Sequence, residues 1–389
     1  MLTKADTDFL WRALELAKRG EGHTRPNPPV GAVIVKGGKI IGEGWHKRCG
    51  GDHAEVAAIK NAMRKDSASP LKGATLYVTL EPCSKPGRVG ACTDAIIAAG
   101  IKRVVYAVAD PNPKNRGKAK RALTRHGIVC ERADVKLDVV HQCEELIREF
   151  KKHVTTGMPF VTVKLAMSLD GKICDDHGNA RWISCEASRK LTGRMREVVD
   201  AIMVGAETVR KDNPSLLSHG KRNDDLIRVV VTRSGMLPKN AQIFTDGAPN
   251  PTRVFRVGRV TRDPKVAADV KGSIAPADPV DAKDLKDVLR QLGKMGVMHV
   301  LCEGGLKLAR SLAETGLVDE WITVLAPIVI GNRAIDQAVR GFAPTFSTWP
   351  GMTDNLCFFE KGYDWRKNRR WISHGGLLCL RESSRRSGR

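Results

Sequence analysis

The feature that most constrains this chain is a set of potential metal ligands in its first hundred residues. His53-Ala54-Glu55 is followed, after a strand-like run, by Pro82-Cys83 and then by Cys92. A histidine and two thiols are common zinc ligands, and three protein ligands leave the fourth position of the metal open for water. Glu55 has the side chain needed to carry a proton from that water to a leaving amine. The alternative is a purely structural zinc, which is normally closed by four protein ligands.

Helical and strand patterns alternate along the first half of the chain, which predicts an α/β fold. His53 and Glu55 lie two positions apart and would point in different directions in mid-helix, so they can share a site only in the first turn. The expected elements are a helix at 7–19, a hairpin of strands at 30–35 and 39–45, a helix at 53–63, a strand at 74–80, a helix at 93–99, a strand at 103–108 and a short strand at 128–129.

Composition limits the class of protein. The 389 residues exceed one ordinary core, and the length favours two domains and allows a third. The formal charge of +22 favours anionic ligands such as phosphorylated substrates, dinucleotides or nucleic acid. Ten scattered cysteines, with no repeated spacing, indicate a reducing compartment. We find no signal-peptide pattern at the N-terminus and no run long enough to span a membrane, so we expect a cytoplasmic protein without membrane contacts.

A charged helix expected at 139–154 is broken by a stretch that ends in Pro159, and we place the domain boundary there. The predicted domains are 1–154 and 159–382, and the basic residues 383–389 are expected to be disordered. In the second domain a Gly304-Gly305 turn between a strand and a helix suits phosphate binding. The expected strands are 160–166, 200–205, 227–231, 253–257 and 299–302, the expected helices are 186–197, 285–295 and 306–314, and a closing hairpin is expected at 371–380.

The order His-x-Glu, Pro-Cys, Cys resembles the cytidine-deaminase-like superfamily of zinc enzymes. Members that edit polynucleotides carry a second cysteine close to the first, but here Pro86 occupies that position and Cys92 lies nine residues beyond Cys83. This wide spacing, together with Pro26-Asn27-Pro28 and His46, is similar to the deaminase of riboflavin biosynthesis. The resemblance implies that His53, Cys83 and Cys92 hold zinc and that Glu55 is the catalytic proton shuttle. It also implies that the deaminase substrate contacts Asn27, His46 and Lys85, the last of which replaces a histidine usual in the family.

The second half resembles the riboflavin-pathway reductase, whose fold is like that of dihydrofolate reductase. Motifs shared in order include Asp170-Gly171-Lys172, Trp182-Ile183-Ser184, Asp212-Asn213-Pro214 and Glu303-Gly304-Gly305. His219 stands where the family often has an arginine. The resemblance implies an NADPH site formed by Ala166, Trp182, Thr208, Asp212 and Gly305. It implies that the reductase substrate is contacted by Lys164, Asp170, Ala180, Arg196, Leu216, His219 and Glu303.

Together these resemblances imply a bifunctional enzyme of riboflavin biosynthesis that uses Zn²⁺ and NADPH on a phosphorylated pyrimidine. A homo-oligomer, either dimer or tetramer, is expected. Two alternatives stay open. The net charge would also suit an RNA-editing or nucleic-acid-binding deaminase, against which the thiol spacing argues. The altered loop at Lys85 would also suit a reductase with an inactive, zinc-stabilised deaminase scaffold.

Overall fold

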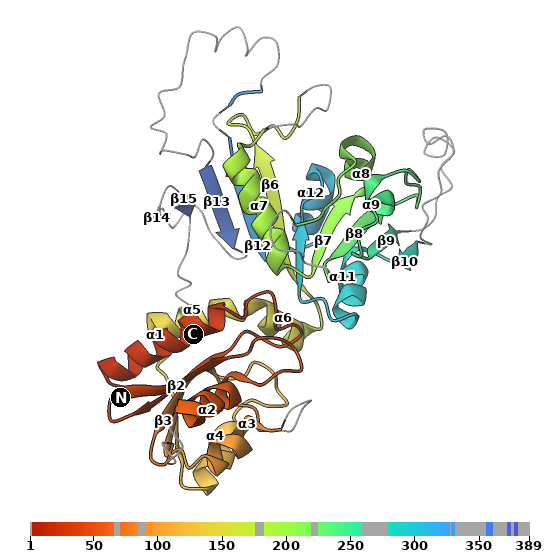
Figure 1. Ribbon diagram of the computed structural model, residues 1–389. Helices are drawn as coiled ribbons and strands as arrows, with labels where there is room; N and C mark the ends of the chain where they lie inside the picture. The colour runs from red at the N-terminus through yellow and green to blue at the C-terminus, as the bar shows by residue number, and fades with distance from the viewer. Residues whose placement is uncertain are drawn as a thin grey trace, which may run out of the picture. The chain divides into compact units, whose positions relative to one another are not determined.

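The computed structural model describes residues 2–65, 71–84, 90–175, 183–218, 225–258, 279–326 and 328–330, and the backbone of short strands at 355–360, 372–374 and 377–379. The chain divides into two compact units (Figure 1). The first comprises Met1–Pro159 with Gly293–Met298, and the second comprises Phe160–Leu292 with His299–Arg389. Lys85, Ala180, Trp182, His219 and the tail 383–389 lie outside the described residues.

The first unit is built on a five-stranded sheet in the order β2-β1-β3-β4-β5. The pairs β1/β2 and β1/β3 are antiparallel, whereas β3/β4 and β4/β5 are parallel. The strands are β1 (Gly31–Lys36), β2 (Lys39–Trp45), β3 (Thr75–Leu80), β4 (Arg103–Val108) and β5 (Val129–Arg132). The helices are α1 (Lys4–Lys18), α2 (Ala54–Lys65), α3 (Cys92–Ala98), α4 (Lys118–Arg125), α5 (Asp138–Leu146) and α6 (Arg148–Thr156).

Helices cover both faces of this sheet. Successive residues of a strand point to opposite faces, so each strand packs against helices on both sides. Ile34 and Leu76 pack with residues of α2, α3 and α4, whereas their neighbours Val35 and Tyr77 pack with residues of α1 and α5. Figure 1 shows α1 and α5 on one side of the sheet and α2, α3 and α4 on the other. The unit is therefore an α/β fold, as the alternating pattern predicts, and its helices form layers on both faces of the sheet.

Close packing of α2 against β2 requires glycine at position 44. A Cβ atom there would lie 2.6 Å from the carbonyl oxygen of Ala54 and would also collide with the backbone nitrogen of Ala58. The first turn of α2 is thereby held close to the sheet. That turn carries Glu55 and follows directly after His53.

The second unit contains an eight-stranded sheet in the order β10-β9-β8-β7-β11-β6-β12-β13. All neighbouring pairs are parallel except β12/β13. The strands are β6 (Phe160–Met167), β7 (Ala201–Gly205), β8 (Ile227–Thr232), β9 (Thr252–Val257), β10 (Val280–Ala282), β11 (His299–Cys302), β12 (Glu320–Leu325) and β13 (Asn355–Glu360). The helices are α7 (Glu186–Val198), α8 (Ala206–Asp212), α9 (Gln242–Thr245), α11 (Leu285–Lys294) and α12 (Leu306–Glu314).

Several elements differ from those expected from the sequence. The single helix expected at 139–154 is two helices, because Ile147 (φ −112°, ψ 14°) leaves the helical conformation while its side chain stays buried. Strand β12 was not expected. It begins at a buried charged residue, Glu320, which accepts a hydrogen bond from Thr162 Oγ1 at 2.9 Å. The hairpin expected at 371–380 is present as β14 (Ile372–His374) paired with β15 (Leu377–Cys379).

In the part of the chain that the structure describes, no helix combines the length and the apolar character needed to cross a bilayer.

Candidate active sites

Three predicted metal ligands of the first unit converge at one end of its sheet. His53 directly precedes α2, Cys83 follows β3, and Cys92 is the first residue of α3. His53 Nδ1 lies 3.1 Å from Cys92 Sγ and 3.6 Å from Cys83 Sγ, and the two sulfur atoms are 3.3 Å apart. Donor atoms bound tetrahedrally to one zinc at about 2.0–2.3 Å lie roughly 3.3–3.8 Å apart. The three side chains therefore fit a single zinc ion, which they would hold with three protein ligands.

The contact between the two thiols shifts their pKa values in opposite directions. A hydrogen bond from the Cys92 thiol, with a further contribution from His53, lowers the pKa of Cys83. The same interaction and the burial of Cys92 raise the pKa of that second thiol. The backbone N–H of Cys92 also donates to Cys83 Sγ at 3.3 Å. A zinc ion held here would bind both cysteines as thiolates, so its binding would release the remaining thiol protons.

Glu55 lies in the first turn of α2 and lines the same cavity as His53 and Cys83. Its side chain is almost fully buried. Burial, followed by the negative charge of Cys83, raises the pKa of Glu55 to about 7. A carboxyl group in such an environment can both accept and release a proton near neutral pH, which is the property that general acid–base catalysis needs.

Asn27 and His46 form one hydrogen-bonded unit in this cavity. His46 Nδ1 lies 2.9 Å from the carbonyl oxygen of Asp52, which can only accept, so Nδ1 carries the hydrogen. Burial lowers the pKa of His46 and favours the neutral ring. Its Nε2 can then accept from Asn27 Nδ2, 3.1 Å away. This pair fixes the plane of the Asn27 carboxamide, and the hydroxyl of Thr24 holds the same loop by donating to the Asn27 carbonyl at 2.8 Å.

The cavity of the first unit has a volume of about 200 Å³ and includes residues that sequence reasoning missed. Asp110 follows the carboxyl end of β4, and burial raises the pKa of its carboxyl group. A signal was available, because polar residues after the carboxyl end of a parallel strand mark a site edge. Phe150 of α6 was expected only as an inward-facing helix residue. The missed lining residues are Pro28, Val30, Ala54, Leu80, Glu81, Asp110, Asn112, Asn115 and Phe150.

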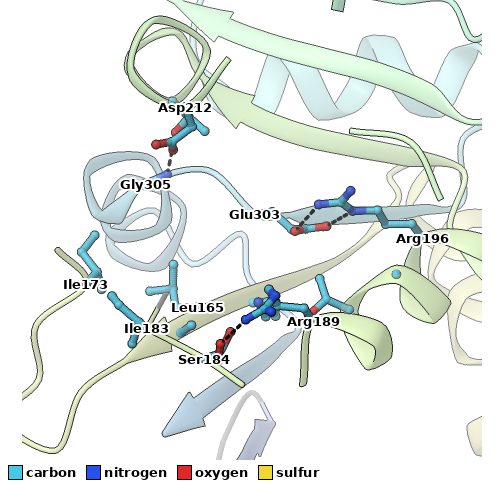
Figure 2. A pocket seen from close by; sticks show the side chains of 14 residues that line it. Leu165, Ile173, Ile183, Ser184, Arg189, Arg196, Asp212, Glu303 and Gly305 are labelled. Carbon is cyan, nitrogen blue, oxygen red and sulfur yellow. Dashed lines mark hydrogen bonds and ion pairs between the residues drawn. The ribbon is translucent and has the colours of Figure 1, made fainter. Parts of the chain in front are cut away.

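A second cavity of about 300 Å³ lies in the second unit (Figure 2). It brings together seven of the predicted NADPH and substrate residues, from β6, α7, α8 and the segment after β11. These are Lys164, Ala166, Arg196, Thr208, Asp212, Glu303 and Gly305.

Two predicted residues of this unit do not line the cavity. Leu216 is 2% exposed, packs in a hydrophobic cluster with Leu226 and Val230, and has a positive φ of 58°. Asp170 accepts a hydrogen bond from the backbone N–H of Ile330 at 3.1 Å. Their roles in substrate binding stay predictions.

The centre of this cavity contains an ion pair between Arg196 and Glu303 (Figure 2). Arg196 Nε and Nη2 donate to the two carboxylate oxygens at 2.8 and 2.9 Å, and Nη1 donates to the carbonyl oxygen of Leu217 at 2.9 Å. Burial alone would lower the pKa of Arg196, but the charge and hydrogen bonds of Glu303 outweigh it and leave that pKa raised.

The turn between β11 and α12 packs closely against the backbone of β7. A Cβ atom on Gly304 would lie 2.6 Å from the backbone nitrogen of Gly205, so no larger residue fits there. The next amide, of Gly305, donates to Thr208 Oγ1 at 3.2 Å. This glycine turn stands at the start of α12, where the N-terminus of a helix favours anionic groups such as phosphates, and Arg189 also lines the cavity.

Sequence reasoning missed the other lining residues of this cavity. Arg189, Thr192 and Gly193 lie on the face of α7 that carries Arg196, and Arg189 Nη1 donates to the carbonyl oxygen of Ser184. Helical spacing counted back from Arg196 would have found them. The remaining missed residues are Leu165, Ile173, Ile183 and Ser184.

Comparison with known protein families divides the chain into the same two parts as the structure does. Residues 3–108 match the cytidine and deoxycytidylate deaminase zinc-binding region, and residues 159–342 match the RibD C-terminal domain. The riboflavin biosynthesis protein RibD of Bacillus amyloliquefaciens is 40% identical over 86% of this chain and 87% of its own length. That of Aquifex aeolicus is 36% identical over 92% of this chain and 97% of its own length.

Solved structures give the same result. Acinetobacter baumannii RibD superposes with a TM-score of 0.72 at 35% identity, covering 85% of this chain and 88% of the other. A Thermotoga maritima protein described as a diaminohydroxyphosphoribosylaminopyrimidine deaminase and 5-amino-6-(5-phosphoribosylamino)uracil reductase also gives a TM-score of 0.72, at 37% identity over 84% of this chain and 88% of the other. The chain belongs to the RibD family of riboflavin biosynthesis proteins.

Proposed function

We propose that this chain catalyses two consecutive steps of riboflavin biosynthesis. The first is hydrolytic deamination of 2,5-diamino-6-ribosylamino-4(3H)-pyrimidinone 5′-phosphate. The second is NADPH-dependent reduction of the ribosyl group to give 5-amino-6-(5-phosphoribitylamino)uracil. The observation that carries the proposal is the grouping of His53, Cys83, Cys92 and Glu55 at one cavity of the first unit. The cavity of the second unit supports the reduction step.

In the deaminase unit, His53, Cys83 and Cys92 hold the zinc ion. When bound, zinc supplies a water molecule whose pKa is lowered enough for it to act as a nucleophile near neutral pH. Glu55 takes the proton from that water on a carboxylate oxygen and delivers it to the exocyclic amine, which leaves as ammonia. The Asn27 and His46 pair orients the pyrimidine ring.

In the reductase unit, Ala166, Thr208, Asp212 and Gly305 face the cofactor. NADPH supplies the hydride that is added to C1′ of the ribosyl group. Arg196 and Glu303 contact the ribosyl phosphate of the substrate: the guanidinium can donate to the phosphate, and the carboxylate can accept from the sugar hydroxyls. Lys164 lines the same cavity and is the candidate proton donor to the ring oxygen that is released when the sugar opens. Deamination precedes reduction because it forms the uracil on which the reductase acts.

The direct test uses the purified protein with the diaminopyrimidine ribosyl phosphate. We expect wild type to release ammonia and to oxidise NADPH. We expect Glu55→Ala to bind zinc, release no ammonia, and still oxidise NADPH when it is given the deaminated substrate. Wild-type protein that binds zinc and reduces the deaminated substrate but releases no ammonia would instead identify the first unit as a scaffold.

Assembly and location complete the proposal. The chain forms a homo-oligomer, as most soluble enzymes with closed symmetry do, and light scattering of the purified protein tests this. It resides in the cytoplasm, where a reducing environment keeps the thiols at Cys83 and Cys92 available for zinc. Free thiols at these two residues support this location, and fractionation of the source cells tests it.

A further inference from the structure

We propose that Glu81 is a positioning residue of the deaminase, which sets the loop 110–119 against the pyrimidine substrate. The inference rests on the proposed deaminase function and adds a residue that acts through this loop. Glu81 immediately follows β3 and stands two residues before the zinc ligand Cys83. A single side chain thus connects the strand that positions a metal ligand to the loop that follows the neighbouring strand β4.

The backbone N–H of Glu81 donates to the carbonyl oxygen of Val108 in the neighbouring strand β4 at 2.8 Å, whereas its side chain binds the loop. Its side chain is 3% exposed. Oε2 accepts hydrogen bonds from the backbone N–H groups of Asp110 at 3.2 Å and Gly117 at 3.1 Å, and Oε1 accepts one from Ala119 at 3.3 Å. A carboxylate that accepts three backbone N–H bonds fixes its partners more strongly than a neutral acceptor does.

The loop that Glu81 holds is the part of the cavity wall richest in polar side chains. Asp110, Asn112 and Asn115 line the cavity together with Glu55. Two hydrogen bonds within the loop stabilise its turns. Asp110 Oδ1 accepts from the Asn112 N–H at 2.8 Å, and Asn112 Oδ1 accepts from the Lys114 N–H at 3.0 Å. These short-range bonds shape the loop, and the pairing of β3 with β4 sets where it begins. The Glu81 side chain adds an attachment at the far end of the loop, at Gly117 and Ala119.

The alternative is that Glu81 only stabilises the fold. The two roles predict different kinetics, because a displaced substrate-facing loop changes substrate binding while the zinc ligands and Glu55 stay in place. Glu81→Gln keeps the size of the side chain but replaces one acceptor oxygen by an N–H₂ group, which faces a backbone donor. Asp6→Asn is the matched control. Asp6 is another buried carboxylate of the same unit, but it lies outside the cavity lining and holds α1 through Arg103 and Tyr77.

The experiment measures deaminase KM and kcat, zinc content and reductase activity for both variants. We expect Glu81→Gln to raise the deaminase KM on the order of tenfold or more, with zinc content and reductase activity unchanged. We expect Asp6→Asn to lower the melting temperature with no change in KM. A wild-type KM in Glu81→Gln would overturn the inference, as would an equal rise of KM in both variants. Absence of ammonia release by wild type would instead overturn the proposed function itself.

Two further measurements keep the inference testable if Glu81→Gln folds poorly. In wild type, hydrogen exchange at the amides of Asp110, Gly117 and Ala119 should be slow, and rapid exchange at all three would contradict the attachment. Glu81→Asp, which retains the charge but is shorter, can be combined with Asn112→Ala. If Glu81 acts through the loop, the two changes raise KM by less together than the product of their separate effects, whereas strictly multiplicative effects would show that Glu81 acts elsewhere.

Discussion

Arg196 and Glu303 lie 107 positions apart in the sequence and meet through two hydrogen bonds of 2.8 and 2.9 Å in the reductase cavity (Figure 2). Their side chains are only 13% and 11% exposed. Each neutralises the other, and the third contact of Arg196, to the carbonyl oxygen of Leu217, fixes the guanidinium plane. The pair therefore presents an oriented polar surface to substrate while neither group carries an uncompensated buried charge.

Arg196→Ala should lower the stability of the second unit and weaken its binding of substrate. Removing one partner leaves the Glu303 carboxylate buried without its cation, which costs about 3–5 kcal/mol of unfolding free energy. It also removes a proposed substrate contact, so reductase KM should rise while ammonia release by the first unit is unchanged. Thermal unfolding and the two activity assays measure both effects.

The control for this prediction is Arg310→Ala. Arg310 pairs with Glu314 at 2.7 Å on the exposed surface of α12, and such pairs contribute little to stability. Arg310→Ala should leave both unfolding and reductase kinetics near wild type. Equal losses in the two variants would show that the effect of Arg196→Ala is not specific to the buried pair.

Local chemistry made the deaminase ligands predictable from the sequence. His53 and Cys92 stand at helix starts and Cys83 follows a strand, and each of these boundaries is marked by short-range patterns in the sequence. Once the order of strand and helix is known, the three ligands must meet at one end of the sheet. The start of α1 was predicted three residues too late, because the capping box between Thr3 and Asp6 was overlooked.

Contacts to backbone atoms were not predictable in the same way. Glu81 binds three amides whose residue types carry no information about the bond, so no pattern in the sequence indicates it. The break between α5 and α6 has a similar cause, because Ile147 is neither glycine nor proline and is an ordinary core residue by type. Its conformation follows from packing that the sequence of the helix does not specify.

Removal of zinc should separate the two activities. The donor atoms of His53, Cys83 and Cys92 lie within 3.6 Å of one another, the spacing of ligands to one metal ion. We expect chelation to abolish ammonia release and to lower the melting temperature of the first unit, because metal binding contributes to folding. NADPH oxidation with the deaminated substrate should continue, and added Zn²⁺ should restore ammonia release. Ammonia release by protein shown to be metal-free would contradict the proposed mechanism.

Gly304→Ala should impair the reductase selectively. The new Cβ would lie 2.6 Å from Gly205 N and 2.7 Å from Val204 Cα, and these backbone atoms of β7 cannot move aside without disturbing the sheet. Overpacking of this kind costs about 1–3 kcal/mol. The shift also displaces Glu303 and Gly305 on either side, so KM for NADPH and substrate should rise.

The matched control is Gly205→Ala in the facing strand. Gly205 has an ordinary negative φ of −81°, and a Cβ there would meet Leu308 Cβ at 4.0 Å, a normal contact. We expect its stability and reductase kinetics to stay close to wild type. If both substitutions were equally harmful, the loss would come from adding a methyl group where β7 faces the turn rather than from the collision at position 304.

The acid stability of the first unit should depend on Asp6. Burial alone would raise the pKa of Asp6, but hydrogen bonds from Arg103, Tyr77 and Thr3 together hold it well below its ordinary value of 3.8. Tyr77 Oη donates to Asp6 Oδ1 at 2.6 Å, and Arg103 Nη1 approaches the same oxygen at 2.7 Å. Because the folded pKa is below the unfolded one, this carboxylate stabilises the fold fully above about pH 4 and progressively less as the pH falls toward the folded pKa.

Asp6→Asn should therefore lower the unfolding free energy of the first unit by about 3 kcal/mol at pH 5. The difference from wild type should shrink as the pH is lowered from 4 towards 2, because wild type loses the same ionised group by protonation. Zinc release in acid affects both proteins, so the measured quantity is the difference between their denaturation curves at each pH. A difference that stays constant across this range would show that the Asp6 carboxylate has a similar pKa in the folded and unfolded states, and that its contacts with Arg103 and Tyr77 do not stabilise the ionised form.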